Sequence, residues 1–280
     1  MTMADEPAPI PTADYKSKFP INPTSTINPR VSMLLWGPSG SGKTILANTA
    51  PGKRLILLFD PDGARSLKPD HTNNLVMDLS AQPPRIVEEA KDAVNPFGLN
   101  NLLTENQDIQ TVIVDSVTAF SMQAVAYSAG HKSAPGAVFE NPSMSGYGFR
   151  NRFVLGLAKN LLAVTGKHNR NIIFICHEDV PKINTEGQVI SITILLGGSL
   201  SEEVPMQISE VWNLRDTGKK RYCIVRSTGI RKPMKSRMFD TRDKFEFEST
   251  YDVVTQKGIT ISFLIDQWSK SGYDKIPLPP

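Results

Sequence analysis

The sequence contains little cysteine, no long apolar run and no strong excess of one charge. Its 280 residues include two cysteines, Cys176 and Cys223, which lie in apolar or mixed runs without the spacing of metal ligands. We therefore expect buried free thiols in a reducing compartment. No segment approaches the roughly 18 to 20 apolar residues of a membrane span, and residues 1–30 lack the apolar core of a secretory signal. These absences predict a cytoplasmic protein without a membrane segment.

The charge balance neither requires nor excludes a polyanionic partner. The 31 basic and 28 acidic residues give a net charge of +3, so any nucleic-acid contact must come from a local patch. Hydrophobic residues make up 40% of the chain, which is enough for a large core. The length fits one extended α/β domain better than two separate domains.

The division of the chain follows from where hydrophobic periodicity starts and stops. Residues 1–30 are rich in Pro, Thr and Asn and have no periodicity. They are predicted to form an extended or disordered N-terminal arm, or alternatively a strand that wraps the domain surface. Residues 31–265 form the predicted main domain, and residues 266–280 form a C-terminal tail.

Apolar strands alternate with helices along most of the main domain. Strands are expected at 31–36, 54–59, 74–77, 111–114 and 171–176, and helices at 43–50, 84–94 and 149–168, with a further helix after Asp115. A loop rich in Gly, Pro, Ser and Asn is expected at 130–148. Segments 180–196 and 210–228 alternate like hairpins. The pattern predicts an α/β fold with a mainly parallel central sheet extended by antiparallel hairpins.

A phosphate-binding motif lies between the first strand and the first helix. It fits G-x-x-x-x-G-K-[ST] and consists of Gly37, Pro38, Ser39, Gly40, Ser41, Gly42, Lys43 and Thr44. The glycines let backbone N–H groups converge on a phosphate, and the following helix directs its positive end at the same oxygens. Lys43 would neutralise the β- and γ-phosphates, and the Thr44 hydroxyl would coordinate magnesium. The motif therefore predicts a P-loop NTPase that binds ATP and Mg²⁺.

Polar residues at the ends of other strands complete the expected site. Asp115 ends the strand TVIV and would point at the bound phosphates as the second magnesium ligand. Asp60 and Asp62 follow the second strand and are candidates to orient or deprotonate water, although Asp-Pro-Asp-Gly is also typical of a turn. His177 ends the strand NIIFIC, where it could either sense the γ-phosphate or have a purely structural role.

The order of these elements resembles the RecA-like recombinase core, which includes bacterial RecA, KaiC-type ATPases and the phage-encoded single-strand-annealing ATPases. The similarity covers residues 31–239. Asp115-Ser116-Val117-Thr118-Ala119 is similar to the VDSVAAL segment of RecA, whereas His177-Glu178 and Lys235-Ser236-Arg237 are closer to the phage annealing branch. The resemblance implies that residues 31–265 form a RecA-like ATPase domain of a phage protein.

The resemblance also implies how the catalytic site would be completed. The family's catalytic glutamate corresponds to Asp62, which is one methylene shorter, so turnover could be slow. Lys235 and Arg237 correspond to a K-x-K or K-x-R pair that reaches the γ-phosphate of a neighbouring copy. This implies a homo-oligomer, either a ring or a filament, with an active site completed in trans. A solvated basic run is the alternative interpretation of RKPMKSR.

The family's two DNA-binding loops correspond to residues 130–148 and 177–196. Cations and aromatic side chains gather in and beside these loops, namely Lys132, Tyr147, Phe149, Arg150, Arg152 and Lys182. They could bind the phosphates and stack on the bases of single-stranded DNA, although such residues are also common at a solvated helix start. The resemblance thus implies annealing or loading in phage recombination, with a single-strand-binding protein as a further candidate partner.

Two other functions fit the phosphate loop. A P-loop kinase for a small molecule would carry an arginine-rich lid, and the sequence shows no clear one. A nucleotide-switched assembly factor would act through its oligomer with little turnover, which Asp62 in place of glutamate would favour.

Overall fold

An eight-stranded sheet forms the centre of the computed structural model, which describes residues 30–60, 63, 73–80, 83–130, 144–252, 255 and 257–280. The strand order is β10-β9-β8-β1-β5-β4-β2-β3. The strands are β1 (Ser32–Gly37), β2 (Lys53–Leu58), β3 (Asn74–Asp78), β4 (Ile109–Asp115), β5 (Asn171–His177), β8 (Glu210–Asp216), β9 (Arg221–Ile224) and β10 (Glu246–Glu248). A separate two-stranded sheet consists of β6 (Lys182–Ile183) and β7 (Val189–Ser191).

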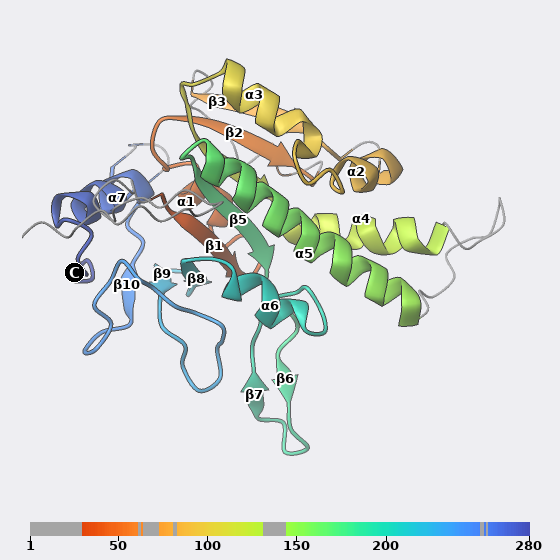
Figure 1. The fold of residues 1–280 in the computed structure, drawn as a ribbon. Helices are drawn as coiled ribbons and strands as arrows, with labels where there is room; N and C mark the ends of the chain where they lie inside the picture. Colours follow the sequence, from red (N-terminus) through yellow and green to blue (C-terminus); the bar gives the residue numbers. More distant parts are fainter. Residues whose placement is uncertain are drawn as a thin grey trace, which may run out of the picture.

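The central sheet has a parallel part and an antiparallel extension. Strands β3, β2, β4, β5, β1 and β8 run parallel to one another, and β9 and β10 add antiparallel strands at the β8 edge. The predicted α/β fold with a mainly parallel central sheet extended by antiparallel strands is therefore confirmed. Of the two predicted hairpins, the β8–β9 hairpin extends the central sheet, whereas the β6–β7 hairpin projects away from it (Figure 1).

Helices cover both faces of the sheet. They are α1 (Lys43–Ala47), α2 (Pro83–Glu89), η3 (Pro96–Gly98), α3 (Leu99–Glu105), α4 (Val117–Gly130), α5 (Met144–Lys167), α6 (Leu200–Met206) and α7 (Ile261–Lys270). The first core cluster joins one face of the sheet to α2, α3, α4 and α5, and the second joins the opposite face to α1 and α7. The result is three layers, in which the inner parallel strands are buried on both sides, whereas the edge strand β3 is partly exposed (Figure 1).

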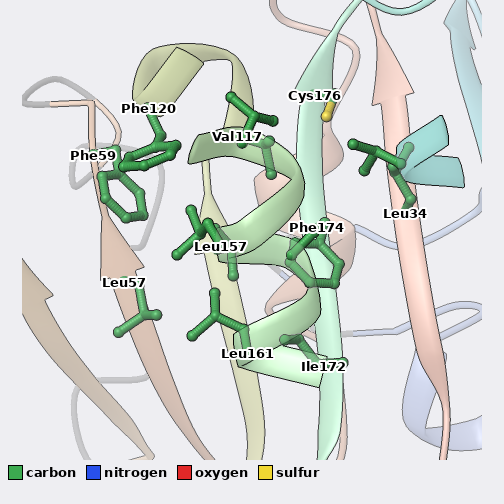
Figure 2. Packing of buried hydrophobic residues seen from close by; sticks show 14 of the residues in the cluster. Leu34, Leu57, Phe59, Val117, Phe120, Leu157, Leu161, Ile172, Phe174 and Cys176 are labelled. Atoms are coloured by element: carbon green, nitrogen blue, oxygen red, sulfur yellow. The ribbon is translucent and has the colours of Figure 1, made fainter. Parts of the chain in front are cut away.

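Alternation along the strands assigns side chains to the two cores. In β1, Leu34 and Trp36 lie in the first cluster, while Met33 and Leu35 lie in the second. Figure 2 shows the first cluster, in which Phe174 and Cys176 of β5 lie on the same side as Leu157 and Leu161 of α5. Cys176 belongs to this cluster and Cys223 to the second, and both are free and fully buried, as predicted.

The helix predictions need four corrections. Helix α1 ends at Ala47, short of the expected residue 50. Helix α5 begins at Met144, so residues 144–148 are helical instead of part of the expected loop, whose residues 131–143 lie outside the described part of the chain. Helix α2 ends at Glu89, short of the expected residue 94. Helices α3, α6 and α7 were not predicted from the sequence, because the first two have seven residues each and show too little periodicity to identify.

The C-terminal residues pack on the domain. Thr260 caps the N-terminus of helix α7, because its hydroxyl accepts a hydrogen bond from the Phe263 N–H. The Ile261 N–H donates to the Thr49 hydroxyl at 2.9 Å, which ties the start of α7 to the turn after α1. Ile276 and Leu278 then pack against the second core cluster. The division into an arm at 1–30, a domain at 31–265 and a tail at 266–280 stays a prediction. Within the described part of the chain, no helix is both long and apolar enough to span a membrane.

Candidate functional site

The carboxyl ends of four parallel strands form the candidate site. In the sheet register, Gly37 of β1 pairs with His177 of β5, and Asp115 of β4 pairs with Leu58 of β2. Strand β5 lies between β1 and β4, which places His177 between the phosphate loop and Asp115. A cavity of about 250 Å³ opens at this edge, lined by Ser39, Gly40, Gly42, Lys43, Thr44, Ile45, Asp60, Gly63, Asp115, Ile175 and His177. The phosphate loop and the strand-end residues predicted from the sequence therefore surround one cavity.

Two glycines of the loop adopt positive φ values that favour glycine, and at Gly37 the backbone of β8 also leaves no room for a side chain. Gly37 has a φ of 154°, and a Cβ atom there would lie 2.2 Å from the carbonyl oxygen of Leu214. Gly42 has a φ of 90°, and a Cβ atom there would lie 3.3 Å from Nη1 of Arg221. Both conformations are strained for residues with a side chain. The loop thus lies against Leu214 of β8 at Gly37 and against Arg221 of β9 at Gly42.

The Lys43 ammonium is buried against the phosphate loop, to which it is bound by hydrogen bonds. The side chain is 5% exposed, and its Nζ donates to the carbonyl oxygens of Gly37 at 3.0 Å and Pro38 at 2.7 Å. Burial lowers the pKa of Lys43 to about 8, although the neighbouring charge of Asp115 opposes this shift. A phosphate group would supply the negative charge that the buried ammonium lacks.

We predict that ATP affinity falls as the pH rises above about 8. In the free protein the Lys43 pKa is about 8, and a bound phosphate would raise it, so that binding above this pH must take up a proton. The dissociation constant should then rise by at most about tenfold per pH unit. Titration of a fluorescent ATP analogue between pH 7 and 9.5 tests this, with Lys43→Arg as the control because its guanidinium stays charged. A constant affinity of the wild-type protein across this range would contradict the prediction.

The lowered pKa of Lys43 also makes the free energy of unfolding depend on pH. The folded-state pKa of about 8 lies below the ordinary value of 10.5, so the charged amine destabilises the folded protein below pH 8. This cost decreases as the pH rises from 8 towards 10.5, because the unfolded chain then binds more protons than the folded one.

Thr44 and Asp115 form the candidate magnesium site. The Thr44 hydroxyl donates to Asp115 Oδ2 at 2.8 Å, which joins the start of α1 to the end of β4. Burial raises the pKa of Asp115, while the Thr44 hydrogen bond lowers it and the charge of Asp60 raises it further. Magnesium prefers oxygen ligands and keeps several waters and phosphate oxygens, so a hydroxyl and a carboxylate suffice as protein contacts. The pair therefore fits Mg²⁺, which would neutralise phosphate charge when bound.

His177 and Asp60 complete the wall of the cavity. The His177 N–H donates to the Thr118 hydroxyl at 3.0 Å, which ties the end of β5 to the start of α4. Burial lowers the pKa of the His177 imidazole, and the Lys43 charge lowers it further, whereas Asp60 opposes both effects. The ring is therefore neutral at neutral pH and can donate one hydrogen bond to a phosphate oxygen. Asp62, predicted to orient water, lies outside the described residues.

Lys235 and Arg237 lie away from their own phosphate loop. The backbone of Lys235 pairs with Val211 of β8, and the Arg237 N–H donates to Glu210 at 2.7 Å. Glu210 pairs with Met33, four residues before Gly37, so Arg237 lies about 13 Å back along the strands at roughly 3.3 Å per residue. Arg237 is exposed. The structure thus brings Lys43, Thr44, Asp115 and His177 together but separates this cation pair from them.

The predicted DNA contacts lie near a second cavity. Tyr147 and Arg150 begin α5, with the Arg150 guanidinium 5.1 Å from the centre of the Tyr147 ring. Arg150 also donates to the Gly197 carbonyl, next to Gly198, which lines a polar cavity of about 440 Å³. Lys182 of β6 lines the same cavity. Arg152 and Phe149 are exposed on α5, whereas Lys132 lies outside the described part of the chain.

One network beside the site was not predicted from the sequence. The Glu178 N–H donates to the Gly37 carbonyl at 3.0 Å, directly beneath the phosphate loop. Its carboxylate accepts a hydrogen bond from Arg231 Nη1 at 2.7 Å, and the same nitrogen donates to Asn213 Oδ1 at 3.3 Å. The position of Glu178 directly after His177 could have suggested that it lies near the site. Its pairing with Arg231 could not be predicted, because Arg231 lies 53 residues further along the chain. The network joins the loop to the segment that carries Lys235 and Arg237.

Comparison with known proteins gives one family match. Residues 30–255 match the family model described as AAA domain. No curated protein matches the chain. Among solved structures, the crystal structure of the RadB recombinase is similar at 16% sequence identity, over 71% of this chain and 84% of that chain, with a TM-score of 0.38. A likeness at this level carries no argument about function.

Proposed function

The chain belongs to the AAA domain family of nucleotide-hydrolysing ATPases, and from this premise we propose that it hydrolyses ATP with Mg²⁺ while bound to single-stranded DNA. The observation that carries the proposal is the contact between Thr44 and Asp115 at 2.8 Å beside the buried ammonium of Lys43. In P-loop ATPases such a lysine cradles the β- and γ-phosphates, and the hydroxyl and carboxylate hold the metal. Catalysis is then mainly positioning and electrostatic stabilisation of the transferred phosphoryl group.

The active site in this proposal is completed by a second copy of the chain. Lys43, Thr44, Asp115 and His177 supply the binding side, and Asp62 or Asp60 orients the water. Arg237 lies about 13 Å and Lys235 about 10 Å back along the strands from their own loop, at roughly 3.3 Å per residue, which supports a role on a neighbour. A head-to-tail contact of this kind produces a ring or a filament.

The DNA part of the proposal has its own support. Lys182 of β6 lines one polar cavity, and Arg150 of α5 donates to the Gly197 carbonyl next to its lining residue Gly198. The Tyr147 ring lies against Arg150, and both Tyr147 and Phe149 are exposed. Cations with adjacent aromatic rings can bind a single strand through phosphates and base stacking. Together with the resemblance of Lys235-Ser236-Arg237 to the phage branch, this favours strand annealing or recombination in a host cytoplasm. A single-strand-binding protein is the further partner we propose.

Steady-state ATP hydrolysis tests this function. We expect single-stranded DNA to stimulate turnover, and we expect the rate to rise more steeply than protein concentration because the active site needs two copies. DNA binding should weaken as salt rises, since contacts to phosphates release counterions. DNA-independent turnover proportional to protein concentration would contradict the proposal. Transfer of phosphate to a small molecule would indicate a kinase, and ATP-dependent oligomers without hydrolysis would indicate an assembly switch.

A further inference from the structure

A buried acid holds the segment that carries the candidate trans cations. Glu210 is the first residue of β8 and is 1% exposed. Its pairing with Met33 places it at the start of the strands, whereas the phosphate loop follows their ends. Glu210 therefore touches neither the cavity around Lys43 nor any group that would bind the chain's own nucleotide.

Among the described residues, Trp212 and the segment 236–238 donate four hydrogen bonds to the Glu210 carboxylate. Oε1 accepts from the backbone N–H groups of Arg237 at 2.7 Å and Met238 at 3.1 Å. Oε2 accepts from the Ser236 hydroxyl at 2.6 Å and from the indole of Trp212 at 2.9 Å. The Ser236 oxygen in turn accepts from the Phe239 N–H at 3.0 Å. Residues 236–239 are thus arranged around a single carboxylate.

A purely packing role does not explain an acid at this position. Burial raises the pKa of Glu210, and the hydrogen bonds from Ser236, Trp212 and the backbone oppose that shift. An apolar side chain would fill the same space without the cost of burying a carboxylate. It would leave the buried N–H groups of residues 237 and 238 without an acceptor, and the turn would lose its fixed shape.

The fixed turn determines where two cations lie. Lys235 Nζ donates to the Met206 carbonyl at 3.3 Å, and burial together with the nearby charge of Arg237 lowers the Lys235 pKa. Within the described residues, no hydrogen bond or ion pair holds the exposed Arg237 guanidinium, although its backbone N–H is held. Because only its backbone is fixed, the reach of that side chain depends on the turn.

We propose that Glu210 is a positioning residue for the trans site. It holds residues 236–238 so that the Arg237 guanidinium, with Lys235 beside it, meets the γ-phosphate bound by a neighbouring copy. This inference rests on the proposed function, because the neighbour's site is part of that proposal. It adds a residue at the opposite end of the sheet from the phosphate loop, whose effect is felt in another copy of the chain.

Mixed oligomers test the inference. A Lys43→Ala copy can donate Arg237 but cannot hold ATP, and an Arg237→Ala copy can hold ATP but cannot donate the cation. We expect the mixture of the two to hydrolyse ATP. Adding Glu210→Gln to the Lys43→Ala copy should reduce that rate by roughly 100-fold, because small displacements of a catalytic group are costly. Adding it to the Arg237→Ala copy should leave the rate unchanged. Ser236→Ala, a milder change, should give a smaller loss in the same arrangement.

The possible outcomes separate this inference from the proposed function. Equal loss in both arrangements would mean that Glu210 has only a structural role, and no loss in either would mean that it positions nothing; both overturn the inference and leave the trans site intact. No activity in the original mixture would overturn the trans site, and the inference with it. Thermal melting of each Glu210→Gln protein verifies that the variants are folded, and ATP binding by the Arg237→Ala/Glu210→Gln protein, which keeps Lys43, verifies that its phosphate loop is intact.

Discussion

ATP binding by Lys43→Ala is expected to weaken by roughly 100-fold or more, with hydrolysis reduced to background, since removal of a charged contact from a preorganised site has effects of this size. In the wild-type protein the buried ammonium donates hydrogen bonds to the Gly37 and Pro38 carbonyls of the phosphate loop. No other lysine or arginine lines the described part of that cavity. Without Lys43, the charge of the β- and γ-phosphates would be opposed by the loop N–H groups and the metal alone.

Isothermal titration with ATP and Mg²⁺ measures the affinity, and a coupled phosphate assay measures the rate. Loss of binding must be distinguished from loss of folding. Burial lowers the Lys43 pKa to about 8, so the charged amine costs stability, and Lys43→Ala should melt at the wild-type temperature or above it. Lys159→Ala, at an exposed position of α5, is the matched control and should bind ATP normally. Wild-type affinity and turnover in Lys43→Ala would remove the central assignment.

Arg237→Ala is expected to bind ATP with unchanged affinity and to lose roughly 10³-fold in turnover, the lower range reported for cations supplied to a γ-phosphate by a neighbouring molecule. Its side chain makes no contact with the residues around Lys43, since its backbone is tied to Glu210 at the start of β8. The affinity is measured by titration and the rate at saturating ATP and single-stranded DNA. Arg242→Ala, which removes an exposed arginine paired with Asp240, is the matched control.

If Arg237 acts on the site of a neighbouring copy, a mixture of Arg237→Ala with Lys43→Ala should regain activity. In an equal mixture with Lys43→Ala, about a quarter of head-to-tail interfaces should combine an intact phosphate loop with an intact Arg237. Activity should therefore return to a similar fraction of the wild-type rate, although each protein alone is inactive. If Arg237→Ala alone hydrolyses ATP at the wild-type rate, the cation has no role in turnover. If the mixture stays inactive although mixed oligomers form, the site is not shared between copies.

Local sequence patterns were sufficient to predict most of the fold and the binding side of the site. The phosphate loop is contiguous, and its glycine spacing can be recognised without knowledge of the fold. Asp115 and His177 were predicted because apolar strands precede them, and parallel strands end at one edge of a sheet. Cys176 and the buried residues of β1 and β5 follow from the same apolar runs.

Contacts between distant segments could not be predicted in this way. Arg221 lies beside Gly42 because β8 pairs with β1 and β9 folds back along β8. The sequence predicts the hairpin, but nothing near either residue indicates that β8 pairs with β1. The Glu178–Arg231 pair spans 53 residues, and the bonds from residues 236–238 to Glu210 span 26 to 28. An acid at the start of a strand is usually solvated, so the sequence alone does not indicate that Glu210 is buried. Its role follows from the turn at residues 236–238, which the fold places against it.

The two buried cysteines can be used to measure local unfolding on each face of the central sheet. Each core cluster contains one of them, Cys176 on the α5 side of the sheet and Cys223 on the α7 side. Burial raises the pKa of both thiols to about 12, and neither side chain is exposed. Since the thiolate is the reactive form, a thiol reagent can modify either residue only when its layer separates from the sheet. The labelling rates of the two residues therefore measure, in one unmodified chain, how often each layer detaches.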